Sequence, residues 1–431
     1  MTAPVQPRLA WLDALRGYAA LVVVGFHLSP QMIGDERHLA VMRHLDLGKY
    51  GVLLFFVVSG YVIPMSLERH GSLRRFWIGR LCRIYPAYLA AIALVAALCA
   101  AGWLTWPASV RAETVTAVLG HATMMPDLLG ERGAVRVFWT LAYEMTFYLI
   151  VSGLFVWRLH RHSAWWAAGL ALTALLAGPR LPDDLLGSTF ADRRATAAVL
   201  LVLVVLSVAA YVRNCLVPAA GAAGIALVLL PAVNGHATRN STVIASWQGL
   251  LLLAVMFAGT VVYRWQHGQI GRAAVLLSLT TVAAGVVGAH WTHLGTTAAL
   301  RVWLANTGAV AITFGLAYAI RNRPVPGVLT WLGRISYSLY LLHAVVLFLI
   351  PRVVPHLGTQ PWPIRLGAGL TYLAVVLSLA TVAYHMVELP GQRLGRWLTA
   401  GPARGPGPRG RVTTQRASPD TGRGENARQS V

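Results

Sequence analysis

Charged side chains are scarce in this chain. Only 12% of its 431 residues are Asp, Glu, Lys or Arg, whereas 56% are hydrophobic, and the mean hydropathy is +0.60. Soluble domains carry about 25% charged residues. The deficit excludes an ordinary soluble domain and indicates a chain that crosses a lipid bilayer many times.

Cysteine and lysine are scarcer still. The three cysteines, Cys82, Cys99 and Cys215, lack the spacing of a metal or redox site, so we interpret them as small hydrophobic residues. Lys49 is the single lysine, and the formal charge of +21 therefore comes from arginines in short loops and in the C-terminal region. This distribution is typical of membrane topology signals and argues against nucleic-acid binding.

Several catalytic and transport signatures are also missing. The sequence contains no Walker loop, no Gly-x-Ser-x-Gly elbow and no His-Glu-x-x-His zinc motif. We therefore expect no metal cofactor. No internal repeat is evident, which weighs against transporter folds built from duplicated halves.

Apolar segments long enough to cross a bilayer as helices recur along the whole chain. They predict an all-α, polytopic transmembrane helical bundle with about 10–12 spans. We place the segments at 9–28, 51–67, 84–104, 137–157, 164–178, 195–212, 215–233, 247–263, 273–290, 302–320, 335–353 and 366–386.

The spans are predicted to belong to one membrane domain at 9–398. Residues 1–8 form a short N-terminus, and the first segment lacks a signal-peptide cleavage site, so we expect it to be retained. Residues 399–431 are rich in Gly, Pro and Arg without apolar periodicity, which is typical of a disordered tail. The loop at 68–83 carries five arginines and is predicted to be cytoplasmic, as are both termini.

The first apolar segment contains two ionisable residues that a bilayer helix rarely carries. Arg16 and His27 are eleven residues apart, which places them on one face of a helix with a rise of roughly 16 Å between them. Asp13 lies one turn before Arg16 on much the same face. Because ionisable residues inside a membrane are usually functional, this stripe predicts a membrane-embedded site.

A pair of arginines precedes the expected third span. Arg80 and Arg83 are neighbours on a helix surface and are followed by Tyr85 and a proline. Together they offer a forked set of donors suited to phosphate. The alternative is plain anchoring of the helix at the inner membrane surface.

A lone carboxylate lies inside the fourth predicted span. Glu144 has no neighbouring charge in the sequence, so it needs a partner from another helix. His27, Arg16 or a hydroxyl group are candidates. A purely structural ion pair is the alternative to a catalytic role.

Polar residues also mark the last two predicted spans. Ser336, Tyr340 and His343 follow one another at helical spacing and form one polar face of an apolar helix. Such a face suits either substrate binding or hydrogen bonds between helices. Glu388 lies at the end of the final span.

In this order, these motifs resemble the acyltransferase-3 family of integral membrane O-acyltransferases. The resemblance spans residues 12 to 390, nearly all of the predicted membrane domain. The matching stretches are 12–17 (LDALRG), His27, 51–60, 80–86 (RLCRIYP), 139–148 with Glu144, 332–343 and 388–390 (ELP).

The resemblance implies transfer of an acyl group, commonly acetyl, from acyl-CoA to a hydroxyl group. The implied acceptor contains sugar: a surface polysaccharide, a glycolipid or a glycosylated natural product such as a macrolide. The partners are then the lipid bilayer, acyl-CoA and the acceptor. We expect a multi-pass protein of a bacterial plasma membrane.

The buried residues fit this chemistry. Arg80, Arg83 and Tyr85 are expected to bind the donor phosphates at the inner surface. His27 is expected to activate the hydroxyl as a general base, oriented by Glu144. Arg16 is expected to stabilise the thioester or the oxyanion. A covalent acyl-His27 intermediate is the alternative route.

A second class of function uses the same residues. Buried arginine, histidine and glutamate side chains can form the proton pathway of a proton-coupled transporter or a lipid-handling protein. The paired arginines and the missing repeat favour the enzyme. Flux of protons or substrate without consumption of a thioester would identify the transporter.

Overall fold

The computed structural model describes residues 9–235 and 243–400, and within them every regular element is helical. Eleven segments of these residues are long and apolar enough to cross a membrane. This confirms the predicted all-α polytopic bundle of about 10–12 spans. The predicted N-terminus at 1–8 and almost all of the predicted tail lie outside the described residues.

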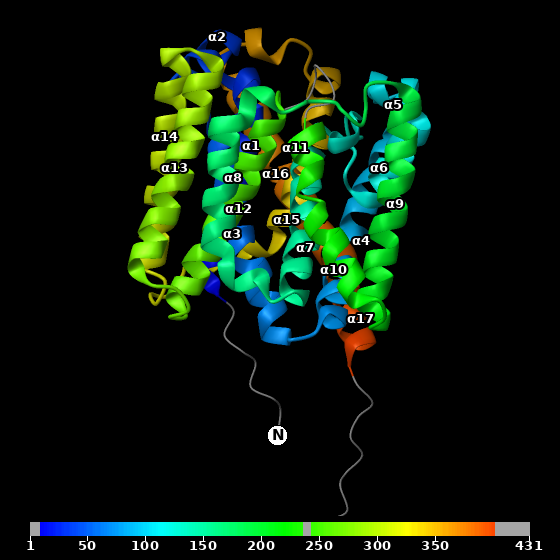
Figure 1. Cartoon of the computed structure of the whole chain (residues 1–431). Helices are drawn as coiled ribbons and strands as arrows, with labels where there is room; N and C mark the ends of the chain where they lie inside the picture. Colours follow the sequence, from blue (N-terminus) through cyan, green and yellow to red (C-terminus); the bar gives the residue numbers. More distant parts are fainter. Residues whose placement is uncertain (1–8, 236–242, 401–431) are drawn as a thin grey trace, which may run out of the picture. The chain divides into compact units, whose positions relative to one another are not determined.

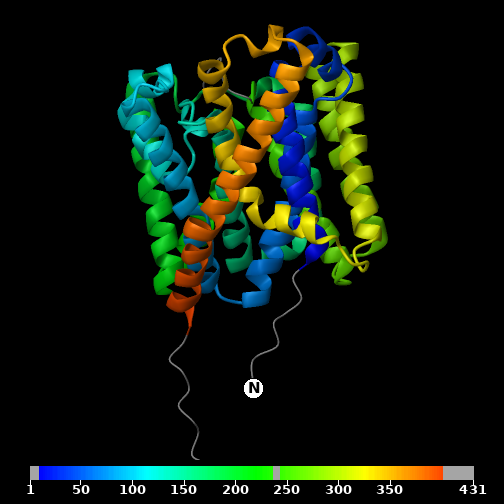
Figure 2. The same cartoon turned by 180° about the vertical axis from the view of Figure 1, so that it is seen from behind.

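The candidate spans form the body of the bundle in Figures 1 and 2. They are α1 (Ala10–Ile33), α3 (Leu47–His70), α4 (Leu73–Ala100), α7 (Trp139–Val156), α9 (Phe190–Arg213), α10 (Val217–Ala226) with α11 (Leu229–Asn234), α12 (Ser246–Gln266), α13 (Arg272–Leu294), α14 (Thr297–Ala319), α15 (Gly327–Val353) and α16 (Trp362–Ala383). A π-helical turn (Tyr384–Glu388) joins α16 to α17 (Leu389–Thr399). The shorter α-helices are α2 (Asp35–Met42), α5 (Ala108–Ala112), α6 (Thr114–Thr123) and α8 (Ser163–Ala177).

Helix α8 is shorter than the candidate spans but runs along two of them. Near its start, Ser278 of α13 donates to the carbonyl oxygen of Ala164 at 3.2 Å, and near its end His293 Nε2 lies 3.0 Å from the carbonyl oxygen of Ala174. It therefore adds a further crossing of the bundle. In both views α1 begins and α17 ends at the same end of the bundle. That this end faces the cytoplasm remains a prediction.

The third span begins eleven residues earlier than the sequence predicts. We expected it at 84–104 with Arg80 and Arg83 in the preceding loop, but α4 starts at Leu73 and Ser72 caps it by accepting from the Arg75 amide at 3.4 Å. Because α4 has 28 residues, it is about 42 Å long and exceeds the hydrocarbon core. Both arginines therefore lie inside a helix and not in a loop, while their position at the membrane surface stays a prediction.

A second departure concerns the region between α4 and α7, which the sequence analysis treated as a plain loop. It contains α5, α6 and a short 3-10 turn (Asp127–Leu129), and the chain from Thr123 to Val135 is almost wholly buried. His121 of α6 anchors it, because its Nε2 accepts from the Ala134 amide at 3.1 Å and its Nδ1 lies 2.6 Å from the Tyr88 hydroxyl. Burial lowers the pKa of His121 to about 4, which keeps the ring neutral in this role.

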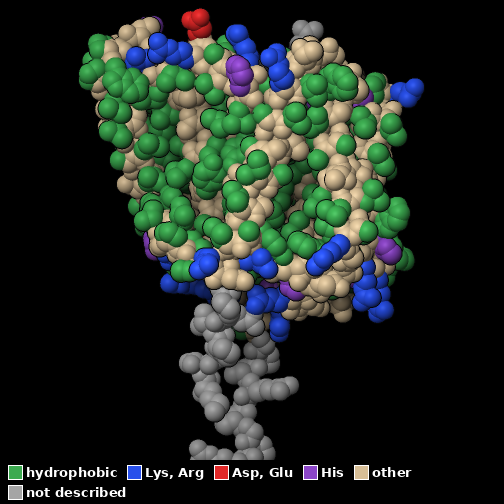
Figure 3. Space-filling view, turned by 90° about the vertical axis from the view of Figure 1, so that its left-hand side faces the viewer, with side chains coloured by type: hydrophobic (Ala, Val, Ile, Leu, Met, Phe, Trp, Pro, Cys, Tyr) green, Lys and Arg blue, Asp and Glu red, His purple; other side chains and the backbone are tan. Residues whose placement is uncertain are grey.

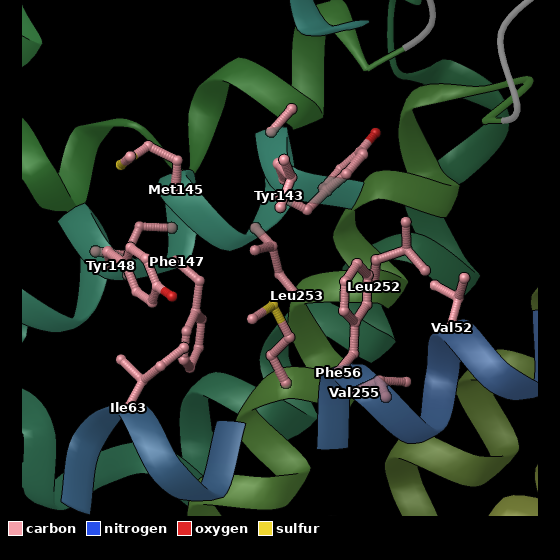
Figure 4. Close-up of a cluster of buried hydrophobic side chains, with 14 of the residues drawn as sticks. Val52, Phe56, Ile63, Tyr143, Met145, Phe147, Tyr148, Leu252, Leu253 and Val255 are labelled. Atoms are coloured by element: carbon pink, nitrogen blue, oxygen red, sulfur yellow. The ribbon is translucent and has the colours of Figure 1, made fainter. Parts of the chain in front are cut away.

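The core lies where α3, α7 and α12 meet, and Figure 4 shows its large side chains interdigitating between these helices. Phe56, Phe147 and Leu253 are buried there. At Gly60 of α3 a side chain would overlap the carbonyl oxygen of Met256, so only glycine permits this approach of α3 to α12. On the face formed by α13 and α14, Figure 3 shows a hydrophobic band between two ends that carry arginines.

Candidate functional site

Close packing of α1 against α15 brings two polar faces together. A Cβ at Gly17 would lie 2.7 Å from the Gly333 amide nitrogen, and a Cβ at Gly333 would overlap the carbonyl oxygen of Asp13. Larger residues at these two positions would separate the helices. As a result, the rings of His27 and His343 approach to a centroid distance of 5.1 Å.

Hydrogen bonds assign the protons of these two histidines. His343 Nδ1 lies 2.8 Å from the Tyr340 carbonyl oxygen and 3.2 Å from that of Leu339, and because a carbonyl only accepts, this nitrogen carries the proton. In a neutral ring the Nε2 of His343 is then an acceptor, and it lies 3.2 Å from His27 Nδ1. His27 Nδ1 also lies 2.9 Å from the carbonyl oxygen of Val23. Both neighbours accept, so neutral His27 is protonated on Nδ1 and its Nε2 holds the lone pair.

His27 borders a polar cavity of about 430 Å³, which we call the histidine cavity. This volume is typical of small-molecule sites. Helices α1, α2, α3, α7 and α15 and the turn before α7 (Arg136–Phe138) contribute to its walls. Its polar lining consists of His27, His38, Asp46, Lys49, Arg136 and Tyr340.

A second cavity, of about 40 Å³, lies beside the first. We call it the arginine cavity, and its polar lining consists of Arg16, Ser59, Thr140, Glu144, Ser336, Tyr337 and Tyr340. Val52 and Tyr340 line both cavities and therefore form the wall between them. The Tyr340 hydroxyl is fixed, because it donates to the Val137 carbonyl at 3.1 Å and accepts from Thr140 at 3.0 Å.

Charged residues from three helices gather around the arginine cavity. Glu144 accepts a hydrogen bond of 2.5 Å from Tyr148, and its carboxylate is within electrostatic range of Arg16 and Arg80. The Arg80 guanidinium lies 5.3 Å from the Tyr148 ring centroid, and the residue is only 9% exposed. Arg16 Nε is buried and has no hydrogen-bond partner among residues 9–235 and 243–400.

Glu388 extends this cluster from the end of the bundle. The π-helical turn directs it toward α15, where it accepts from the amide at 3.0 Å and from the hydroxyl of Ser338. Arg16 and Arg83 are both within electrostatic range of its carboxylate. With Asp13, which is also within electrostatic range of Arg16, the cluster combines three guanidinium groups with three carboxylates.

The structure brings some of the predicted site residues together and separates others. Arg16 and His27 share α1 as predicted, and the polar face of α15 meets them. Glu144, however, pairs with Tyr148 beside the arginine cavity, whereas the side chain that contacts the His27 ring nitrogen is His343. Sequence reasoning did not identify that pairing.

Two expected roles stay predictions. A rise of roughly 16 Å separates Arg16 from His27 along α1, so Arg16 lies about three helical turns from the ring that it is expected to assist. Tyr85 donates to the Ala122 carbonyl at 2.7 Å, at the edge of α6, so its hydroxyl is engaged within the protein.

The sequence analysis missed four polar residues of the histidine cavity. His38, Asp46 and Arg136 lie in regions that we treated as loops, and no pattern marked them. Lys49 had a signal that we did not use for function, because it is the only lysine of the chain. Within residues 9–235 and 243–400, no group of three or more His, Cys, Asp or Glu residues could hold a metal ion.

Comparison with known proteins identifies relatives of this chain. Residues 9–183 match the acyltransferase domain of a known protein family, and this region contains Arg16, His27 and Glu144. The exopolysaccharide production protein ExoZ of Rhizobium meliloti is 29% identical over 370 residues, which cover 82% of this chain and 92% of ExoZ. No solved structure matches the chain.

Two further relatives match over a shorter region. The acyltransferase MdmB of Streptomyces mycarofaciens is 26% identical over 181 residues, which cover 40% of this chain and 46% of MdmB. Nodulation protein 10 of Rhizobium leguminosarum is 29% identical over 181 residues, which cover 38% of this chain and 48% of that protein. The chain thus spans about half the length of these two relatives. Together with the matched domain, these similarities show that residues 9–183 resemble the acyltransferase-3 family.

Proposed function

We propose that this protein is a membrane O-acyltransferase that moves an acyl group, in the first instance acetyl, from acyl-CoA to a hydroxyl group of a sugar-containing acceptor. The observation that carries the proposal is the free lone pair of His27 Nε2 beside a polar cavity, with a cluster of arginines behind the Tyr340 wall. Among the relatives, one is named as an acyltransferase and another as an exopolysaccharide production protein, which favours a surface polysaccharide as the acceptor class.

The chemistry follows from the histidine pair. His27 Nε2 takes the proton of the acceptor hydroxyl while the hydroxyl oxygen attacks the carbonyl carbon of the thioester. The C–S bond then breaks, and the proton on Nε2 passes to the leaving thiolate, so that an ester and free CoA are formed. His343 acts as a positioning residue, because its Nε2 accepts from His27 Nδ1 and holds the imidazole in the tautomer that the reaction needs.

The arginine cavity is proposed to receive the donor. Its guanidinium groups suit the phosphates of acyl-CoA: Arg16 is within electrostatic range of both Glu144 and Glu388, and Arg83 is within range of Glu388. Arg80 packs on Tyr148 and thereby positions the partner of Glu144. The thioester reaches His27 only when the wall formed by Val52 and Tyr340 opens.

This donor route agrees with the predicted topology. Acyl-CoA is made in the cytoplasm, and Arg16 lies on the part of α1 nearest the chain termini. We therefore propose a multi-pass protein of the bacterial plasma membrane with both termini in the cytoplasm. The histidine cavity then lies in the outer half of the membrane, where a surface polysaccharide or its precursor is accessible.

The proposal is tested with the full chain in proteoliposomes that are supplied with acetyl-CoA and a cell-envelope polysaccharide fraction. Release of the CoA thiol and mass spectrometry of the polysaccharide are measured together. We expect one acetyl ester for each thiol released, and neither product in empty vesicles. Proton or solute flux without thiol release would contradict the proposal and identify the transporter instead.

A further inference from the structure

Arg136 has an environment unlike that of Arg193 and Arg194, two arginines at the same end of the bundle. Arg193 lies 3.6 Å from Glu131, and Arg194 lies 2.7 Å from Glu113. Arg136 forms no such ion pair within residues 9–235 and 243–400, although it is exposed and lines the histidine cavity. Its guanidinium is instead within electrostatic range of other basic groups, His27, Lys49 and Arg132.

Lys49 brings a second cation to the same cavity from a different helix. Its ammonium group lies 5.3 Å from the ring centroid of Trp139, which follows Arg136 by three residues. Asp46 and Asp127 are both within electrostatic range of Lys49, but only Asp46 lines the cavity. One Asp46 oxygen already accepts from the Lys49 amide at 2.9 Å. The lining thus holds two basic side chains, Arg136 and Lys49, and one carboxylate.

We propose that Arg136 and Lys49 bind an anionic group of the acceptor, a phosphate or a carboxylate, while the acceptor hydroxyl lies at His27 Nε2. The inference rests on the proposed function, because it assigns the substrate class of that same site. A guanidinium offers a planar pair of donors for an anion, and an ammonium adds a mobile charge at its other side. A cationic acceptor such as an amino sugar is repelled by the same two groups.

The assignment to the acceptor follows from where the cavity lies. The arginines proposed for the donor line or adjoin the arginine cavity, on the other side of Val52 and Tyr340. Arg136 lies on the opposite side of this wall, in the turn that precedes α7. An anion held there is within the cavity that His27 borders, as an acceptor must be.

The test measures binding of four sugars to the detergent-solubilised full chain by calorimetry: glucose 1-phosphate, glucuronate, glucose and glucosamine. We expect both anionic sugars to bind more tightly than glucose, and glucosamine to bind more weakly. Arg136→Gln should lower the affinity for the anionic sugars by about tenfold and leave the affinity for glucose unchanged. Arg132→Gln is the matched control, because Arg132 lies in the same loop but does not line the cavity.

Several outcomes would overturn the assignment. One is equal affinity for glucose and the anionic sugars. Another is that Arg136→Gln and Arg132→Gln change the affinity for the anionic sugars equally. If CoA competes with the anionic sugars for the wild-type protein but not for Arg136→Gln, Arg136 and Lys49 would be assigned to the donor. The ratio between glucose 1-phosphate and glucuronate distinguishes a phosphate acceptor from a carboxylate one. His27→Gln should leave this binding intact while abolishing transfer, so failure of the two proposals is distinguishable.

Discussion

The two cavities on either side of Tyr340 differ in size and in chemical character. The histidine cavity has a volume of about 430 Å³ and combines a neutral histidine pair with cations at its rim. The arginine cavity has a volume of only about 40 Å³ and is surrounded by paired and hydrogen-bonded charges. The proposed acceptor side is therefore preformed, whereas the proposed donor side is closed. The difference indicates that admission of the thioester requires movement, and that Val52 and Tyr340 form the barrier.

The largest expected effect is on the KM for acetyl-CoA and arises at the arginine cavity. Arg16→Lys keeps the charge but loses the planar fork, so we expect the KM for acetyl-CoA to rise by about tenfold or more. Steady-state transfer kinetics measure this change. Arg334→Lys, an exposed arginine of α15, is the control and should behave as wild type. An unchanged KM in Arg16→Lys would remove the donor from the arginine cavity.

On the preformed side, the next largest effect is expected at His343. His343→Phe removes the acceptor for His27 Nδ1, and loss of such a partner typically reduces activity by about 10- to 100-fold. We expect the loss in kcat, with the KM for acetyl-CoA unchanged. His343→Gln can keep an acceptor near the Nε2 position and should recover part of the activity. Equal losses in the two variants, at equal thermal stability, would show a merely structural role.

The wall itself can be tested without an acceptor. Tyr340→Ala opens a path between the cavities, so we expect hydrolysis of acetyl-CoA by water to rise several-fold. Tyr340→Phe keeps the ring and should leave hydrolysis low, although the hydrogen bonds to Val137 and Thr140 are lost. The measurement is thiol release from acetyl-CoA alone. Unchanged hydrolysis in Tyr340→Ala would mean that the barrier lies elsewhere.

The smallest effect is a pH dependence at the rim of the histidine cavity, in the buried loop that presents Arg136. Burial raises the pKa of Glu131 to about 7, despite Arg193 nearby, whereas hydrogen bonds from Arg194 lower the pKa of Glu113 to about 2. Folded Glu131 thus holds its proton at pH values where the unfolded residue, with its ordinary pKa near 4.5, has lost it. Stability contributed by this residue therefore falls as pH rises from about 5 through 7.

Thermal unfolding between pH 5 and pH 8 measures this dependence. Glu131→Gln should flatten the fall in the unfolding temperature over that range. Glu113→Gln should leave the slope in place, because Glu113 stays ionised throughout it. A slope that persists in Glu131→Gln would show that another group is responsible.

Periodicity within single segments predicted the parts of the site that lie on one helix. The Arg16–His27 stripe and the polar face of α15 were both predicted in this way, because helical spacing alone places side chains on a face. The start of α4 was not predicted, since its arginines resemble a loop, whereas in the structure Arg80 packs on the rings of Phe76 and Tyr148. The pairing of His27 with His343 spans 316 residues and depends on two glycines that let α1 and α15 touch. Sequence spacing carries no information on such contacts.

The central claim is that the free Nε2 of His27 carries the proton during acyl transfer. Single-turnover transfer by His27→Gln and His290→Gln tests it most directly, because each histidine places its Nδ1 near the carbonyl four residues earlier, at 2.9 Å and 2.7 Å respectively. His290 Nε2 lies 3.4 Å from the Gln248 amide and does not line the histidine cavity. We predict that His27→Gln lowers the rate of acetyl ester formation by at least about 10²-fold while His290→Gln retains it. Similar rates in the two variants would contradict the account.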